Sequence, residues 1–120
     1  MNALAVAVGA AAGALVRWQV GLLWNARWSG FPLGTLAVNL IGGFLIGLAL
    51  VGLARPDQSL WRLLLVTGFL GGLTTFSAFS AESLQLLQRG AWGLALAHSL
   101  VHVLGALGAA GLGVWVARSL

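Results

Sequence analysis

The sequence predicts an all-α membrane protein, a single transmembrane domain of four helices that covers residues 1–120. Hydrophobic residues make up 60% of the chain and charged residues only 7%, and the mean hydropathy is +1.00. A water-soluble domain needs a charged surface, which this composition does not provide. Four apolar runs are separated by short polar segments, and each run is near or above the roughly 20 residues that a helix needs to cross the hydrocarbon core.

The four runs have clear ends in the sequence. They cover about residues 3–24, 33–54, 61–87 and 91–117. Tryptophan is enriched where a helix meets the membrane–water interface, so tryptophans near the run ends support these boundaries. Five tryptophans lie there: Trp24, Trp28, Trp61, Trp92 and Trp115. The first run has no basic segment before it, so we expect no cleaved signal peptide.

The few charged residues indicate membrane topology rather than a nucleic-acid surface. All six basic residues are arginines, and they are scattered along the chain. With four spans, both termini share a face with the 55–60 loop. That face holds three arginines and the opposite face two, a weak bias that favours neither orientation. Insertion in both orientations is therefore our hypothesis. The absence of cysteine excludes disulfides and cysteine metal sites.

Pairs of glycines four residues apart predict close contacts between helix backbones. Two interpretations remain open: these pairs pack helices within one chain, or they hold together a homo-oligomer whose functional path lies between subunits. The pairs are Gly9 with Gly13, Gly43 with Gly47, and Gly68 with Gly72.

Polar residues inside the first two runs are costly in a membrane and need a partner or a purpose. Arg17 either extends its charge to the interface or faces an aqueous vestibule where it concentrates anions. The first two runs contain no carboxylate that would neutralise it. Thr35 and Asn39 share one helix face. The Asn39 amide either joins two helices or, with the Thr35 hydroxyl, donates neutral hydrogen bonds that replace the hydration of an anion.

The stretch "GGLTTFSAFSAE", residues 71–82, predicts a break near the middle of the third helix. Gly71 and Gly72 loosen the backbone, and the hydroxyls of Thr74 and Thr75 compete for backbone hydrogen bonds. A break at membrane depth frees carbonyl groups, which is tolerated where they are buried in protein or face water or an ion. Such carbonyls are suitable ligands for a hard cation.

Two phenylalanines follow the predicted break on one helix face. Phe76 and Phe79 are three residues apart, with Ser77 and Ser80 beside them. Such rings usually pack in a core. Their edges carry the positive part of the ring quadrupole, however, and would stabilise an anion without a formal charge.

The quoted stretch resembles the third-helix signature of the Fluc (CrcB) family of fluoride channels, G-G-x-T-T-F-S-T-F-S-x-E. "GTLAVNLIGG" is similar to the family's second-helix motif, and "GALVRW" to its first-helix motif. Length and four-helix layout agree along the whole chain. The resemblance implies a channel in the inner (plasma) membrane that exports fluoride from the cytoplasm by passive flow and confers fluoride resistance. It also implies an antiparallel, dual-topology homodimer with two pores between the subunits.

The resemblance implies roles for individual residues along these pores. Phe76 and Phe79 correspond to the phenylalanines that line the pores, and Asn39 matches the pore asparagine. Thr35 and Ser77 belong to a track of hydroxyl groups.

Further positions follow from the same resemblance. Ser80 belongs to the pore wall, Arg17 matches the vestibule arginine, and Glu82 matches the acid that we expect near a pore mouth. A central structural sodium ion (Na+) would be held by backbone carbonyls, which map onto Gly71 and Thr74.

The chain departs from the family pattern at two places. Ala78 stands where the family usually has threonine, so one hydroxyl is missing. The fourth helix carries His98, Ser99 and His102 where a tyrosine and serines are common. The two histidines share a face. Their neutral imidazoles either donate hydrogen bonds to fluoride, titrate at acid pH, or bond to a neighbouring helix.

Two other functions are weaker fits. A small dual-topology drug exporter needs a carboxylate deep in the membrane to exchange protons for a cationic substrate, whereas the first run holds Arg17 and Glu82 lies near the end of the third. A membrane anchor that binds haem or metal would use His98 and His102, but we expect no nearby Asp, Glu or Cys to complete the metal shell. No nucleophile, base and orienting acid converge, so we predict no enzyme.

Overall fold

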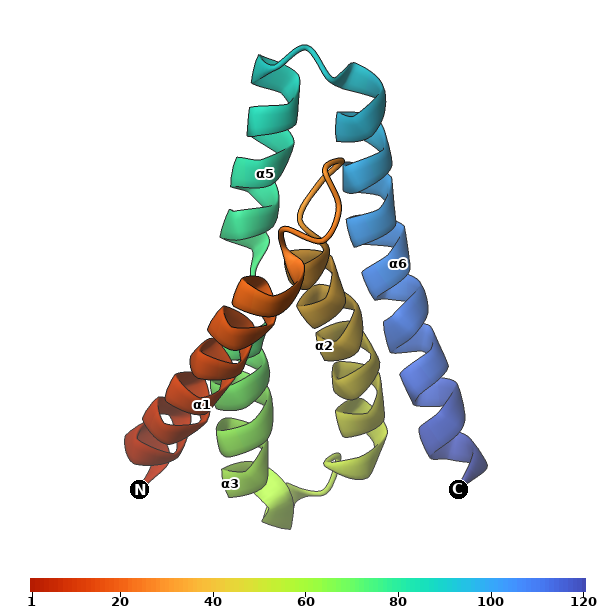
Figure 1. The fold of residues 1–120 in the computed structure, drawn as a ribbon. Coiled ribbons are helices and arrows are strands. Elements are labelled where there is room, and N and C mark those ends of the chain that lie inside the picture. Colours follow the sequence, from red (N-terminus) through yellow and green to blue (C-terminus); the bar gives the residue numbers. More distant parts are fainter.

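The structure is a computed structural model that describes residues 1–120, and it is entirely helical (Figure 1). Three spans are continuous helices: α1 (Asn2–Trp24), α2 (Leu33–Gly52) and α6 (Trp92–Ser119). The remaining span, residues 56–88, is assembled from shorter helices. All four segments are long and apolar enough to cross a membrane, as the sequence predicts.

The third span is divided into pieces that follow one another along the chain. It starts with η1 (Pro56–Gln58) and α3 (Ser59–Trp61), and continues as the π-helical η2 (Arg62–Leu70) and α4 (Gly71–Leu73). After a two-residue interruption it ends with α5 (Phe76–Gln88). Gly90, with a φ of 74°, then turns the chain into α6.

The predicted break is present, but it falls on the threonines alone. Thr74 and Thr75 have extended backbones, with φ and ψ of −84° and 156° and of −151° and 113°. Gly71 and Gly72 are helical instead. Gly72 is needed for contact, because a Cβ there would meet the carbonyl of Ala10 on α1. The Thr75 side chain starts the next helix by accepting a hydrogen bond from the Ala78 N–H at 3.0 Å.

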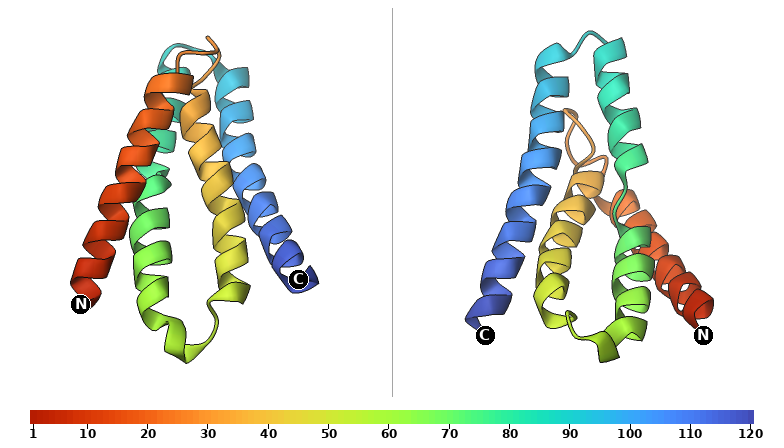
Figure 2. Two further views of the ribbon diagram at one scale, coloured as in Figure 1. Left: turned by 60° about the horizontal axis from the view of Figure 1, so that its bottom comes forward. Right: turned by 180° about the vertical axis from the view of Figure 1, so that it is seen from behind.

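The spans are arranged so that both termini lie at one end of the molecule. Figures 1 and 2 show the N- and C-terminal ends beside the connection between α2 and α3, with the other two connections toward the opposite end. This arrangement agrees with the expected even number of crossings.

The predicted glycine pairs bring helix backbones together within the chain. A Cβ at Gly9 would meet the Leu64 carbonyl, and one at Gly13 would meet the Phe69 carbonyl, both on η2. Gly43 and Gly47 lie in the same way against Ala106 and Ala110 of α6. The intrachain interpretation of these pairs is therefore confirmed. Only 18 of the 120 residues are buried, so most apolar side chains remain available to lipid or to further protein.

Candidate functional site

An open cavity of about 480 Å³ lies beside the helix break, and we call it the break groove. Residues of α2, η2, α4, α5, α6 and the break itself line it. Six of the predicted site residues meet here: Asn39, Gly71, Thr74, Phe76, Phe79 and His102. The break thus brings together groups that come from three separate apolar runs.

Asn39 holds the break in place through its amide. Its Oδ1 accepts a hydrogen bond from the Thr75 N–H at 2.8 Å, and its Nδ2 donates to the Thr75 carbonyl at 3.1 Å. The second Nδ2 hydrogen is directed at Nδ1 of His102, also at 3.1 Å. Both amide N–H groups that the sequence suggests for an anion are therefore engaged within the chain.

Two backbone carbonyls at the break lose their usual helical partners. The Thr75 N–H, which in an unbroken helix would bond the Gly71 carbonyl, donates to Asn39 instead. The Ala78 N–H, which would bond the Thr74 carbonyl, donates to the Thr75 hydroxyl. Both residues line the break groove. Free carbonyl oxygens are the ligand type that a hard cation prefers, so these two residues fit the implied sodium site.

The predicted phenylalanines lie together on the groove. Their ring centroids are 5.4 Å apart, and the Phe76 side chain is 77% exposed. Phe79 stacks on His98 at 5.3 Å and leans on His102 at 4.8 Å. Phe76 therefore offers an open ring to whatever occupies or covers the groove, whereas Phe79 forms the boundary between the groove and the histidines.

The predicted serines of α5 do not line the break groove. Ser77 is exposed, with its hydroxyl 3.3 Å from that of Thr75. Ser80 is also exposed and donates to the Phe76 carbonyl at 2.9 Å. Both hydroxyls therefore lie near the start of α5 without facing the break groove in the single chain.

A second cavity of about 400 Å³, here called the arginine cavity, lies on the other side of the break. Arg17, Thr35, Ala78 and Glu82 are among its lining residues, and Thr75 lines both cavities. Arg17 donates from Nε to the Gly72 carbonyl at 3.0 Å and forms no ion pair with Glu82. The hydroxyl that Ala78 lacks would therefore have been added to this cavity and not to the break groove.

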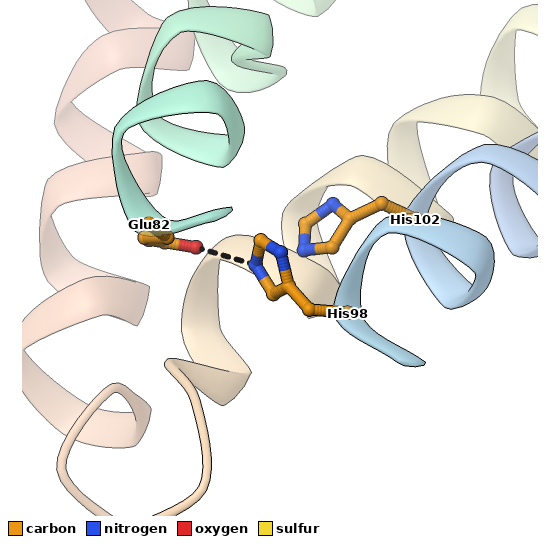
Figure 3. A group of neighbouring side chains, drawn as sticks. All are labelled: Glu82, His98 and His102. Atoms are coloured by element: carbon orange, nitrogen blue, oxygen red, sulfur yellow. Dashed lines mark hydrogen bonds and ion pairs between the residues drawn. The ribbon is translucent and has the colours of Figure 1, made fainter. Parts of the chain in front are cut away.

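Glu82 is held by partners from two other helices. Thr35 donates its hydroxyl to Oε2 at 2.6 Å, and Nε2 of His98 lies 3.1 Å from Oε1 (Figure 3). His98 is fully buried, and its Nδ1 lies 2.7 Å from the Ser83 hydroxyl. Both carboxylate oxygens and both ring nitrogens of this pair have partners.

This arrangement corrects one expectation about the histidines. We predicted no acidic residue near His98 and His102, but Glu82 lies beside them. One possible metal-ligand atom from each of the three side chains lies within 4.8 Å of the other two. The cause is the turn at Gly90, because it makes α5 and α6 antiparallel neighbours and sets Glu82 opposite His98. The expectation that the histidines bond to neighbouring helices is met by Glu82 on α5 and Asn39 on α2.

Among Glu82, His98 and His102, only His102 has a side-chain polar atom without a hydrogen-bond partner. Its side chain is buried, at 4% exposure, and its Nε2 has no hydrogen-bond partner. An unpaired buried donor or acceptor costs about 1–3 kcal/mol, so it demands an explanation.

Sequence reasoning missed the central place of Thr75 among the site residues. It bonds Asn39 through its backbone, caps α5 through its hydroxyl and lines both cavities. A signal was available, because a threonine directly before a new helix is a preferred N-cap residue. Ser83 and Asn25 were also missed: Ser83 bonds His98, and the Asn25 side chain accepts from the Thr35 N–H at 3.0 Å.

Comparison with known proteins gives a consistent result along the chain. The family model described as "CrcB-like protein, Camphor Resistance (CrcB)" matches residues 4–114. A protein of Cupriavidus pinatubonensis is 53% identical over 98% of this chain and 94% of its own length. A protein of Bordetella petrii is 54% identical over 100% of this chain and 94% of its own length. A protein of Chromobacterium violaceum is 56% identical over 87% of this chain and 84% of its own length. All three are named "Fluoride-specific ion channel FluC".

Proposed function

The chain belongs to the CrcB-like family, and from this membership we propose that it is a fluoride-selective channel that lets fluoride leave the cytoplasm down its gradient. The observation that carries the proposal is the likeness, above 50% identity over nearly the whole chain, to proteins named as fluoride-specific channels. The prediction that the chain is not an enzyme agrees with this family of channels. Weak acid brings HF into a cell, fluoride dissociates there, and the channel gives it a path out, which confers resistance.

The break groove supports a path for a small anion. Phe76 and Phe79 line this groove and their ring edges would stabilise the anion, while the N-terminus of α5, which the break creates, places the positive end of a helix dipole beside them. Neutral groups of this kind replace a hydration shell and still release the ion, as a selective pore requires. We assign Asn39, Thr35, Ser77 and Ser80 to this path as well.

Charged and fourth-helix residues complete the proposed path. Arg17 on the arginine cavity would concentrate fluoride before it enters, because its charge is not neutralised by a carboxylate. Glu82 would lie near a pore mouth. On the fourth helix, His102 lines the break groove and would face the path, and His98, whose two ring nitrogens both have partners, would support it from behind.

We further propose an antiparallel, dual-topology homodimer in the inner (plasma) membrane, with two pores at its interface. An exposed aromatic ring beside an open groove is what a second subunit would cover, and Phe76 has this position. The weak arginine bias across the membrane also supports insertion both ways.

A central structural sodium ion belongs to the same proposal. The carbonyls of Gly71 and Thr74, freed as described above, would be its ligands in each subunit. Bound at the interface of two breaks, the cation would lock the subunits together.

The drug-exporter alternative finds less support. Such an exporter needs a membrane carboxylate that is free to exchange a proton for a cation. One oxygen of Glu82 already accepts a hydrogen bond from Thr35, and the other faces the His98 imidazole.

The experiment that tests the proposed function is ion efflux from loaded liposomes. Purified protein in vesicles filled with fluoride should release it, as measured with a fluoride electrode, while protein-free vesicles retain it. Release of chloride at the same rate, or release of neither ion, would refute the proposed function.

A further inference from the structure

We propose that His102, held in one tautomer by Asn39, supplies the fourth helix's hydrogen bond to fluoride through its Nε2–H. In this arrangement Asn39 is a positioning residue that acts through His102, because its own N–H groups are already in use. The inference rests on the proposed channel function. It adds which atom donates the hydrogen bond to fluoride and how the proton is held on that atom.

The orientation of the Asn39 amide follows from the backbone of the break. A backbone N–H only donates and a backbone carbonyl only accepts. The Asn39 atom that faces the Thr75 N–H is therefore the oxygen, and the atom that faces the Thr75 carbonyl is the nitrogen, at 2.8 and 3.1 Å. Turning the amide over would set donor against donor and acceptor against acceptor.

The Asn39 amide in turn determines the proton position on His102. Its nitrogen faces Nδ1 of His102 at 3.1 Å and, being a donor only, requires a lone pair there. The imidazole is then neutral, with its proton on Nε2. That nitrogen is the buried one without a partner, so it is a hydrogen-bond donor that lacks an acceptor.

The missing acceptor is not supplied by the neighbouring side chains. Oε1 of Glu82 faces Nε2 of His98, and Oε2 accepts from Thr35. Figure 3 shows the His98 ring between Glu82 and the His102 ring, and all three side chains have ligand atoms within 4.8 Å of one another. A small anion at Nε2 would therefore have a fixed donor on one side and a carboxylate nearby. The carboxylate would keep the anion from binding too tightly, and rapid release is what conduction requires.

A metal ion is the other ligand that three such side chains suggest, because their ligand atoms lie within 4.8 Å of one another. A metal requires a lone pair on Nε2, which would move the proton to Nδ1. Nδ1–H would then face the N–H of Asn39, and the hydrogen bond between them would be lost. The tautomer therefore favours an acceptor such as fluoride over a metal ion.

Phe79 controls access to this donor. Its ring lies on both imidazoles, at 5.3 Å from His98 and 4.8 Å from His102, and it also lines the break groove. Displacement of this one ring would join the buried Nε2–H to the groove, so the ring would move when fluoride passes.

Two substitutions test the roles of the two ring nitrogens of His102 separately. His102→Asn keeps an acceptor where Nδ1 lies and removes the donor at Nε2, so we expect fluoride efflux to fall about tenfold or more, the effect of one hydrogen bond to a charged group. His102→Gln places an amide nitrogen near the position of Nε2, and we expect it to keep most of the flux. Leu107→Ala, which shortens an exposed side chain on the same helix, is the control and should conduct like the unchanged protein.

The outcomes separate this inference from the proposed function. If the unchanged protein releases fluoride selectively and His102→Asn releases it equally fast, the inference is wrong and the channel function stands. If the unchanged protein releases no fluoride, the function itself is wrong. Zinc that slows the unchanged protein but not His102→Asn would assign a metal ligand instead and overturn the inference.

A direct measurement of the tautomer is independent of transport. Nitrogen NMR of the ¹⁵N-histidine-labelled protein in detergent should place the proton on Nε2 of His102, and that resonance should shift with fluoride but not with chloride. A proton on Nδ1 would overturn the inference, whatever the flux.

Discussion

At the scale of single residues, the break depends on Asn39, whose side-chain amide makes the hydrogen bonds that a backbone peptide group would make in a helix. The Asn39 amide gives Thr75 both a donor and an acceptor, which an unbroken helix would have supplied itself. A break at membrane depth is stable only when its polar groups are satisfied in this way. Asn39 therefore links the break in the third span to the position of the His102 side chain.

Asn39→Asp tests this coupling. The carboxylate has no N–H for the Thr75 carbonyl or for Nδ1 of His102, and it adds a negative charge on the groove. We expect fluoride efflux to fall by about 100-fold or more, because two hydrogen bonds are lost and the charge repels the anion. Efflux from liposomes measures the effect, and size-exclusion chromatography should show the same elution volume as for the unchanged protein. Efflux at the original rate would contradict the coupling.

Phe76→Ile tests the aromatic ring without touching the core. Phe76 is 77% exposed in the single chain, so an aliphatic side chain there should leave the fold intact. Isoleucine has no ring edge with positive quadrupole, and we expect slow or absent fluoride efflux from vesicles. An unchanged rate would assign Phe76 to packing alone.

At the scale of helices, local signals predicted much of the structure. Hydropathy marked the four spans, and the threonines of residues 71–82 marked the break, because both depend on residues close together in sequence. The pairing of Asn39 with Thr75 did not follow, since 36 residues separate them and only packing of α2 against the break brings them together. Glu82 and His98 were within reach of prediction, because they lie eight residues on either side of the turn at Gly90.

Close packing of α1 on η2 makes a prediction about glycine. Gly13→Ala would place a Cβ against the Phe69 carbonyl, and we expect it to lower the free energy of unfolding by about 1–3 kcal/mol, as overpacking does. Gly108→Ala is the matched control on α6, because a Cβ there meets nothing within 4 Å. Thermal unfolding in detergent, followed by tryptophan fluorescence, measures both. Equal stability of the two variants would contradict the predicted contact.

At the scale of the whole molecule, a single chain exposes the groove that would form the path. Phe76, Gly71 and Thr74 lie on or beside an open cavity, and few residues are buried. A second subunit is the simplest cover, and the proposed antiparallel arrangement would bring two breaks together. The oligomer could not be derived from the residues themselves, because the glycine pairs that suggested it pack within the chain.

Dual insertion makes a prediction about the termini. Both ends of the chain lie at the same end of the molecule, so a single tag reports the orientation of the whole chain (Figure 2). In cells, a protease added to one side of the membrane should remove a C-terminal tag from about half of the chains, because neither orientation is preferred on insertion. Complete removal or complete protection would show one orientation and exclude the antiparallel dimer.

The most direct test of the central claim compares two anions in one preparation. Liposomes that contain the purified protein are loaded with equal fluoride and chloride, and the release of each ion is followed with its own electrode. A channel of the proposed kind releases fluoride rapidly and retains chloride. Equal release of both ions, or release of neither, would contradict the claim that this chain forms a fluoride-selective path.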